Sequence, residues 1–314
     1  MIIDTQSHYI PAEALRLLED VRWGAVKPSG LPAQFSRTHP MVSLDARLHE
    51  MDRCSVDVAV LSFAPVGPAP DPALDTEIAI AANDGLIAAC ALNPDRFVAL
   101  ARLPPPNAVA ANAELERVRD AECMRGIALL AEATQYRPDL LELEEVWSAC
   151  SDRAWPVVLH PPAGGPDISD AFSAFGLSSG INAMIGSTLV LARLIYFGVL
   201  DRHPKLELIA THLGGVAPFL AERLDSRGKG AEYPFSHYLR NRLYLDNCGY
   251  PAGPALRCAI DVVGAQRIVL GSDWPSRPID ECLAPLVALN DADRRAIAGE
   301  TASRWFNLAQ AARA

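Results

Sequence analysis

The sequence predicts an α/β fold, a single TIM barrel in which eight parallel strands alternate with helices. Three observations support this prediction. Short apolar runs alternate with stretches of helical periodicity, a histidine or aspartate closes or follows four of the runs, and the chain has 314 residues. A (β/α)₈ barrel of this length commonly forms one domain around one core, so we expect residues 1–314 to be a single domain.

Eight short runs rich in β-branched and other apolar residues are the predicted strands. Their hydrophobicity is nearly continuous, which is typical of strands that helices cover on both faces. The runs are Met1–Asp4, Val56–Ser62, Phe97–Arg102, Gly126–Leu130, Pro156–His160, Leu206–Thr211, Leu243–Asp246 and Ile268–Gly271.

Apolar residues recur at helical spacing between these runs. The predicted helices include Leu44–Cys54, Leu74–Leu92, Asn107–Glu122, Leu140–Arg153 and Ile181–Leu200. The longest irregular stretches, after the first, fifth and sixth strands, are Val21–Val42, Pro161–Gly180 and Lys229–Arg242. Loops of this length are usually functional, and in TIM barrels the loops that follow strands build the active site.

Periodicity alone does not separate a closed barrel from an open doubly wound sheet, but the polar residues at the strand ends do. His8, His160, His212 and Asp273 follow or close the first, fifth, sixth and eighth strands. In a barrel these ends converge on one rim, where three imidazoles and a carboxylate can bind a divalent metal. A lone histidine after a strand is more often a packing residue, but four such residues at strand ends predict a site. The other histidines are interpreted as structural: His39, His49, His203 and His237.

Four motifs extend over almost the whole chain. They are Ile3-Asp4-x-x-x-His8, Val158-Leu159-His160-Pro161, the block from His203-Pro204-Lys205-Leu206 to His212-Leu213-Gly214-Gly215, and the run from Ile268 to Gly271-Ser272-Asp273-Trp274-Pro275. With these motifs the sequence resembles the amidohydrolase-related family that includes aminocarboxymuconate-semialdehyde decarboxylase and the resorcylate and carboxyvanillate decarboxylases. The resemblance implies a TIM barrel of the amidohydrolase type and a homodimer.

The resemblance also implies roles for individual residues. His8 and His160 look like metal ligands, and Asp273 looks like a ligand and a proton carrier. His212 looks like the imidazole that polarises or protonates the substrate. Arg223 falls where some relatives place an arginine that reaches into the neighbouring subunit's site to hold a carboxylate. A surface ion pair is the alternative for Arg223.

The first strand departs from the family pattern. The first strand of these relatives ends in His-x-His or Glu-x-His, whereas this chain has Gln6 before His8. Because an amide oxygen is a weaker ligand, two outcomes are open. Either His8, His160 and Asp273 hold one divalent ion, Zn or Mn, with Gln6 as a weak or water-mediated ligand, or the metal is lost. In the second case the same side chains act as acid, base and hydrogen-bonding groups. We expect the metal to be retained, because three ligands are the usual minimum of a catalytic site.

The lysines limit the kind of metal site. Binuclear members of the wider superfamily bridge two metals with a modified lysine on the fourth strand, and Gly126–Leu130 contains none. The only lysines are Lys27, Lys205 and Lys229, outside that strand. We therefore expect a mononuclear site at most.

Three functions remain open on this evidence. The first is a non-oxidative decarboxylase of a small unsaturated or aromatic carboxylic acid, with catalysis by His212 and Asp273 and with Arg223, Arg37 and Trp274 as candidate substrate-binding residues. The second is a metal-dependent hydrolase of an ester, lactone, amide or C–C bond. The third is a metal-free relative that catalyses dehydration or cyclisation, or only binds a ligand, for which Gln6 is the reason.

Composition excludes other partners. The formal net charge of −10 and the absence of a basic run argue against nucleic acid and anionic membrane surfaces. The N-terminus lacks the pattern of a signal peptide, and we expect no membrane-spanning segment. Seven cysteines without a C-x-x-C pair fit a reducing compartment. The sequence therefore predicts a cytoplasmic enzyme that acts on a small-molecule acid.

Overall fold

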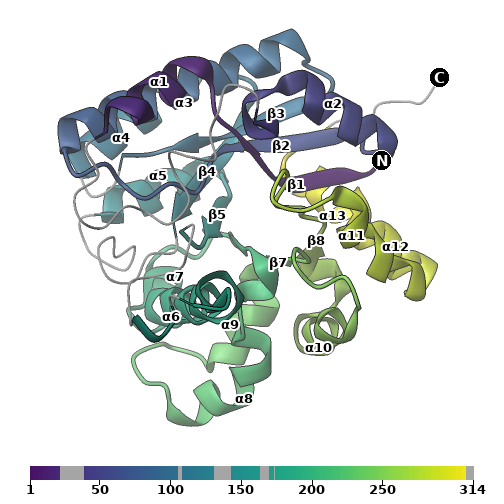
Figure 1. Ribbon diagram of the computed structural model, residues 1–314. Helices are drawn as coiled ribbons and strands as arrows, with labels where there is room; N and C mark the ends of the chain where they lie inside the picture. The colour runs from purple at the N-terminus through teal and green to yellow at the C-terminus, as the bar shows by residue number, and fades with distance from the viewer. Residues whose placement is uncertain (22–38, 105–107, 131–142, 163–169, 173, 309–314) are drawn as a thin grey trace.

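Eight parallel strands form one sheet in the order β1 to β8 in the computed structural model, with helices around them (Figure 1). The structure describes residues 1–21, 39–104, 108–130, 143–162, 170–172 and 174–308. The strands are β1 Ile3–Tyr9, β2 Val58–Phe63, β3 Phe97–Arg102, β4 Met124–Leu130, β5 Val157–His160, β6 Leu208–Ala210, β7 Leu243–Asp246 and β8 Ile268–Val269. All eight predicted strands are therefore present.

Hydrogen bonds between β1 and the residues after β8 close the sheet into a barrel. The backbone N–H of Thr5 donates to Leu270 O at 2.9 Å, and that of His8 donates to Trp274 O at 2.9 Å. In return the N–H of Asp273 donates to Gln6 O at 2.9 Å. The last strand and its following turn thus lie beside β1, which confirms the barrel and excludes the open sheet.

The helices of the described part of the chain lie outside the strands (Figure 1). They are α1 Ala12–Asp20, α2 Leu44–Arg53, α3 Pro72–Leu92, α4 Ala108–Val118, α5 Glu144–Arg153, α6 Ala183–Tyr196, α7 Val199–Arg202, α8 Ala217–Arg227, α9 Phe235–Asn241, α10 Pro254–Val263, α11 Ile279–Leu283, α12 Asp291–Arg295 and α13 Thr301–Trp305.

Alternation along the strands divides the apolar core into two parts. One set of side chains, for example Val58, Val60, Val98 and Leu100, forms a cluster with α13. The intervening set, for example Ala59, Leu61 and Ala99, packs in the large cluster that includes the surrounding helices. Since successive strand side chains point to opposite faces, the first set fills the barrel interior and the second faces the helices.

Two predictions of the sequence were wrong. The first strand does not end at Asp4 but continues to Tyr9, because the polar residues after Asp4 are buried and pair with β2, as His8 does with Ser62. The stretch Lys229–Arg242 is not wholly irregular, since Phe235–Asn241 forms α9. There Phe235, Tyr238 and Leu239, spaced three and four residues apart, bury one face of the helix.

The helical segment Ser178–Tyr196 also differs from expectation. It is long and apolar enough, by length and composition, to cross a membrane, although the sequence was expected to contain no such run. Half of it is buried within the protein, and a core helix of a soluble protein meets the same criteria. In this barrel it includes α6, which packs on the outside of the strands.

Candidate active site

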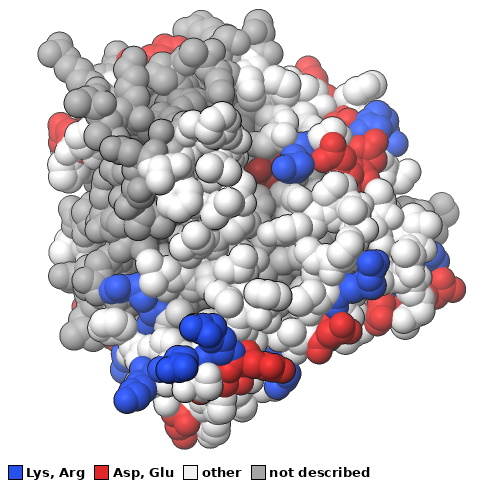
Figure 2. Space-filling view, turned by 60° about the horizontal axis from the view of Figure 1, so that its bottom comes forward, with Lys and Arg blue, Asp and Glu red and all other residues white. Residues whose placement is uncertain are grey.

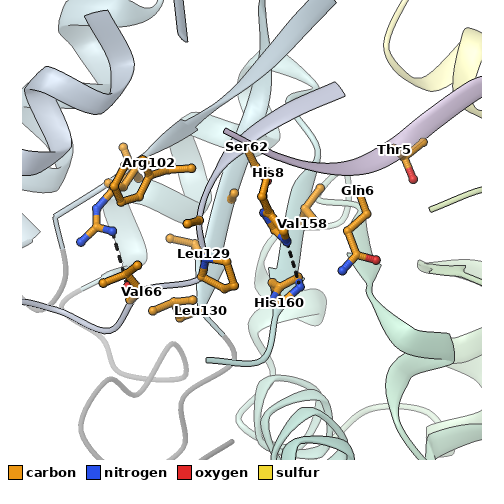
Figure 3. Close-up of a pocket in the computed structure, with 15 residues that line it drawn as sticks. Thr5, Gln6, His8, Ser62, Val66, Arg102, Leu129, Leu130, Val158 and His160 are labelled. Carbon is orange, nitrogen blue, oxygen red and sulfur yellow. Dashed lines mark hydrogen bonds between the residues drawn. The ribbon is translucent and has the colours of Figure 1, made fainter. Parts of the chain in front are cut away.

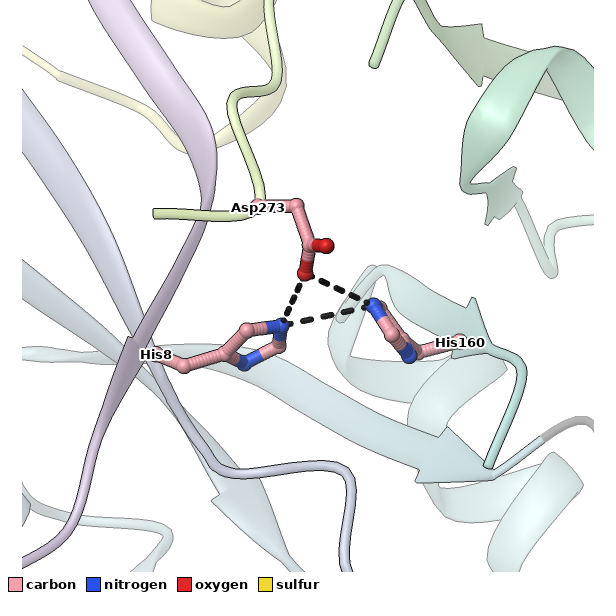
Figure 4. Close-up of side chains that lie close together, drawn as sticks. All are labelled: His8, His160 and Asp273. Carbon is pink, nitrogen blue, oxygen red and sulfur yellow. Dashed lines mark hydrogen bonds and ion pairs between the residues drawn. The ribbon is translucent and has the colours of Figure 1, made fainter. Parts of the chain in front are cut away.

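Three predicted ligands meet at the rim of the barrel (Figure 4). His8 Nε2 lies 2.9 Å from Asp273 Oδ1, and His160 Nε2 lies 3.3 Å from both His8 Nε2 and Asp273 Oδ1. A triangle of these dimensions has points about 2 Å from all three atoms, which is the usual bond length from a divalent metal to imidazole nitrogen or carboxylate oxygen. The three side chains therefore fit one metal ion.

The second ring nitrogens of both histidines have partners that favour this use. His160 Nδ1 lies 2.6 Å from Pro161 O. A carbonyl can only accept, so in the neutral ring the proton is on Nδ1 and the Nε2 lone pair points to the centre. His8 Nδ1 lies 3.1 Å from Ser62 Oγ, a hydroxyl that can accept from it as well as donate. Both imidazoles can thus present a lone pair to a cation.

The pKa values agree with these protonation states. Burial lowers the pKa of His8, although Asp273 opposes the shift. Burial lowers the pKa of His212 to about 4. Burial would raise the pKa of Asp273, but the neighbouring imidazoles of His160 and His8 outweigh it and keep that pKa below its usual value. At neutral pH the rings of His8 and His212 are neutral and Asp273 is a carboxylate, the forms in which these side chains bind metals.

Gln6 completes the wall of the centre without being a strong ligand. Its Nε2 lies 3.3 Å from Asp273 Oδ1 and 3.4 Å from His212 Nε2. Its Oε1 is buried and has no hydrogen-bond partner among the described residues. An unpaired buried amide oxygen is costly, and a cation or its bound water would satisfy it once the amide turned. The donor set of this chain therefore fits a metal, with Gln6 as a neutral fourth group.

His212 and Asp273 share an unusual backbone conformation. Their φ angles are +54° and +62°, in the left-handed region that residues other than glycine seldom adopt. His212 is held there by its N–H, which donates to the buried Asp246 Oδ1 at 2.8 Å. Non-glycine residues in this region are concentrated at functional sites, where the surrounding structure compensates for the strain. Both predicted catalytic residues are thus among the seven non-glycine residues that have a positive φ in the described part of the chain.

Gly215 allows this turn to pack closely against α6. Its φ is +70°, and a Cβ there would lie 2.2 Å from Met184 O and 2.7 Å from Thr188 Oγ1. We expect Gly215→Ala to lower the free energy of unfolding by about 1–3 kcal/mol for a backbone conformation (ψ −118°) that only glycine adopts readily, and by a further ~1–3 kcal/mol for the clash. Denaturant titration measures the change.

Gly264→Ala is the matched control for Gly215→Ala. Gly264 has φ +82° and nothing within 4 Å of the added Cβ. Its ψ of 148° also lies in a region that only glycine adopts readily, so Gly264→Ala should lose only the conformational part, about 1–3 kcal/mol. Equal losses in the two variants would show that the contact with α6 is not tight.

The structure describes two of the three predicted substrate-binding residues. Trp274 is 7% exposed and stacks against Arg47, whose guanidinium carbon lies 4.2 Å from the ring centre. Arg223 is exposed on α8. Arg37 lies outside the described residues. A direct role in substrate binding stays a prediction for all three.

A pocket beside the metal ligands contains residues that the sequence reasoning missed. Its volume is about 580 Å³, including space open to solvent, and its lining includes Gln6, His8 and His160 together with Ser62 and Arg102. Ser62 and Arg102 occupy inward positions near the carboxyl ends of β2 and β3. Strand alternation is the signal that places both on the inward face, since each follows two inward apolar residues at a spacing of two, but it does not predict that Arg102 is buried there.

Known proteins match almost the whole chain in sequence. The amidohydrolase family model matches residues 3–308. Gamma-resorcylate decarboxylase of Rhizobium sp. (strain MTP-10005) is 32% identical over 292 residues, which cover 84% of this chain and 87% of that protein. The resemblance deduced from the four motifs is thereby confirmed.

Solved structures agree in fold over nearly the whole chain. A structure of 2,6-dihydroxybenzoate decarboxylase with bound 2,6-dihydroxybenzoate has a TM-score of 0.85 and 26% identity, covering 98% of this chain and 99% of the other. A dihydroxybenzoic acid decarboxylase from Polaromonas sp. JS666, with manganese and the inhibitor 2-nitroresorcinol, has a TM-score of 0.81 and 25% identity, with coverage of 98% and 97%. The protein is therefore a TIM-barrel member of the amidohydrolase family.

Proposed function

We propose that this protein is a metal-dependent, non-oxidative decarboxylase of a small aromatic carboxylic acid. The observation that carries the proposal is the convergence of His8, His160 and Asp273 on one point beside a pocket lined mainly by apolar side chains. The relatives support it, because those named above decarboxylate dihydroxybenzoates and one binds manganese.

The metal would be held by His8, His160 and Asp273, with Gln6 beside it. When bound, a divalent ion supplies positive charge that holds the substrate carboxylate and an adjacent oxygen. Manganese is our choice, because a relative contains it. The apolar side chains of the pocket, such as Leu130 and Val158, would bury the faces of the ring and exclude water from it.

The reaction exchanges the carboxyl group of the substrate for a proton. A proton is added to the ring carbon that bears the carboxylate, the bond from that carbon to the carboxylate carbon breaks, and its electron pair returns to the ring as CO₂ leaves. We assign proton transfer to Asp273, which rests as a carboxylate and can take a proton from a substrate hydroxyl before passing it to carbon. His212, a neutral imidazole on the same rim, would hydrogen-bond the substrate and orient it.

A hydrolase is the competing reaction, and product analysis separates the two. We would load chelator-stripped protein with Mn²⁺ and supply 2,6-dihydroxybenzoate and related hydroxybenzoates. Release of CO₂ with formation of the corresponding phenol supports the proposal. Hydrolysis of ester or lactone probes without any CO₂ release would replace it with the hydrolase. Protein that retains less than roughly a tenth of an equivalent of any divalent metal would favour the metal-free alternative.

Replacing Gln6 with glutamate tests how near this position lies to the ion. Gln6→Glu places a second carboxylate where the amide now faces Asp273 Oδ1 at 3.3 Å. Two carboxylates at this distance repel unless a cation separates them, so we expect Mn²⁺ to bind about 10-fold more tightly. Titration calorimetry with metal-free protein measures the affinity.

The control for Gln6→Glu is Gln266→Glu, which adds the same charge at an exposed position near β8. It should leave the affinity for Mn²⁺ unchanged within about twofold, since surface charges are screened. If Gln6→Glu also failed to change the affinity, Gln6 would not lie beside the ion.

We also propose that the protein forms a homodimer through α6 and α8. Ile181, Ile185 and Leu189 recur every four residues along the α6 segment and are 38–45% exposed, and Phe219 on α8 is 79% exposed. The two helices are adjacent, because the N–H of Val216 donates to Thr188 Oγ1 at 2.9 Å. Arg223 follows Phe219 by one helical turn, so it would lie in this interface and could reach the partner's pocket.

Surface charge is compatible with this assembly and with a small-molecule substrate. On the face drawn in Figure 2, basic and acidic side chains are interspersed and leave a broad uncharged area between them. Sedimentation velocity would show a dimer if the proposal holds, and a monomer at micromolar concentration would exclude it. We further propose that residues 1–314 form one domain, since the family model matches 3–308, and that the enzyme is cytoplasmic, since its seven cysteines are free.

A further inference from the structure

Arg102 points into the barrel at the level of the active site. It follows Val98 and Leu100 on β3 at a spacing of two residues, and both of these belong to the interior cluster. Ser62 follows Val58 and Val60 on β2 in the same way, and His160 follows Val158 on β5. Arg102 therefore occupies on β3 the kind of inward rim position from which His160 reaches the metal centre.

The pocket joins Arg102 to the metal centre. Figure 3 shows Arg102 on one side of the pocket and Gln6 on the other, with His8 and His160 between them. In this view Leu130, the strand neighbour of His160, lies between the arginine and the histidines. A ligand that fills the pocket and touches the histidines with one polar group would thus meet a guanidinium with its other end.

The guanidinium of Arg102 has unused hydrogen-bonding capacity. It is 7% exposed, its Nη2 donates to Asp75 Oδ1 at 2.8 Å, and its Nη1 lies 3.4 Å from Val66 O. Its Nε is buried and has no hydrogen-bond partner within the described part of the chain. A guanidinium carries five N–H donors, so this pairing leaves donors free for an incoming oxygen.

The surroundings fix Arg102 in place before any ligand binds. Asn83 Oδ1 accepts from the Arg102 N–H at 2.8 Å, and Asn83 Nδ2 donates to the Arg102 carbonyl at 2.9 Å. The guanidinium carbon lies 4.8 Å from the ring centre of Phe63, which also lines the pocket. A charged group held by its backbone, its counter-ion and an aromatic face loses little entropy on binding an anion.

We propose that Arg102 binds a second acidic group of the substrate, at the end of the pocket away from the metal centre. The substrate class is then an aromatic dicarboxylate, in which one carboxylate reacts at the metal centre and the other is held by Arg102. This assignment rests on the proposed function of the site. It makes Arg102 the residue that selects diacids over monoacids, and Asp75 the residue that sets the charge of Arg102's surroundings.

Two substitutions should change affinity in opposite directions. Removing the guanidinium with Arg102→Met should weaken the binding of a diacid about 10- to 100-fold and leave a monoacid nearly unchanged. Neutralising its counter-ion with Asp75→Asn should instead tighten the binding of the diacid, because a carboxylate then no longer balances the positive charge of Arg102. A pair that served only to stabilise the fold would give losses in both variants and for both ligands.

The experiment measures binding, so that it does not depend on turnover. Isophthalate, terephthalate and benzoate are titrated by calorimetry into the Mn²⁺-loaded protein, whose metal content is measured for every variant. Arg102→Met leaves Asp75 buried without a partner, so the double variant with Asp75→Leu is also made. Arg242→Met, which removes a half-buried arginine bonded to the carbonyls of Leu200 and Leu206, is the matched control.

The proposal expects at least one diacid to bind the wild type about 10-fold or more tightly than benzoate, and this preference to vanish in Arg102→Met and in the double variant. Equal affinities for diacids and benzoate in the wild type would overturn it, as would weaker binding in Asp75→Asn. A diacid preference without CO₂ release from any acid would overturn the proposed reaction and leave the assignment of Arg102 standing. CO₂ release without a diacid preference would overturn the assignment of Arg102 and leave the proposed reaction standing.

Discussion

Asp273→Asn is expected to remove most of the bound metal and to lower turnover by about 10³-fold or more. The carboxylate supplies the one negative charge in the triangle formed with His8 and His160, and an amide in its place is a neutral, weak ligand. The same change removes the group to which we assign proton transfer. Metal content and the rate of CO₂ release, measured on the same preparation, test both effects.

The substitution itself should be tolerated by the fold. Asp273 has φ +62°, and asparagine is among the residues that adopt this conformation most readily. Asp261→Asn, at an exposed position on α10, is the control and should keep both metal and activity. An Asp273→Asn protein with full turnover would remove this residue from the mechanism. Full metal content with lost turnover would restrict its role to proton transfer.

Much of this site could be predicted because a barrel converts strand order into spatial proximity. His160 and Asp273 are separated by 113 positions, yet their ligand atoms lie 3.3 Å apart. No local pattern contains that contact, but the ends of parallel strands in a closed sheet must meet at one rim. Assigning eight strands was therefore enough to bring the four predicted residues together.

The site residues that the sequence did not predict are those whose role depends on which face of a strand they occupy. The sequence predicted Arg102 at the end of a strand but did not predict that its side chain points into the barrel, because an arginine at a strand end usually reaches solvent. Its burial requires Asp75 and Asn83, which are 27 and 19 positions away on α3. Such a network forms only when β3 and α3 pack together, which no local sequence pattern predicts. Similarly, the polar residues from Thr5 to His8 resembled a loop until pairing with β2 and closure by Trp274 made them a strand.

The strain at His212 is a second feature that sequence alone could not supply. Gly214 and Gly215 permit a close approach of the backbone, but the positive φ of His212 and the hydrogen bond from its N–H to Asp246 are seen only in the folded chain. Burial raises the pKa of Asp246 to about 7, although the N–H groups of His212 and Cys248 lower it. A buried carboxyl from β7 thus positions an imidazole that follows β6.

His212→Asn is expected to separate catalysis from metal binding. His212 lies on the same rim, with a ligand atom within 4.8 Å of the Asp273 carboxylate, but outside the triangle that includes His8 and His160. We therefore expect the variant to keep its Mn²⁺ while turnover falls by about 10²- to 10⁴-fold, the usual contribution of a positioned acid, base or hydrogen-bond donor.

Asparagine is the right replacement because it keeps the left-handed backbone that alanine would strain. His49→Asn, on the exposed face of α2, is the control and should behave as the wild type. A kcat loss with unchanged KM places His212 in the transition state, whereas a raised KM with unchanged kcat would assign it to substrate binding alone. Loss of the metal in His212→Asn would contradict this assignment, since it would make His212 a ligand in addition to His8, His160 and Asp273.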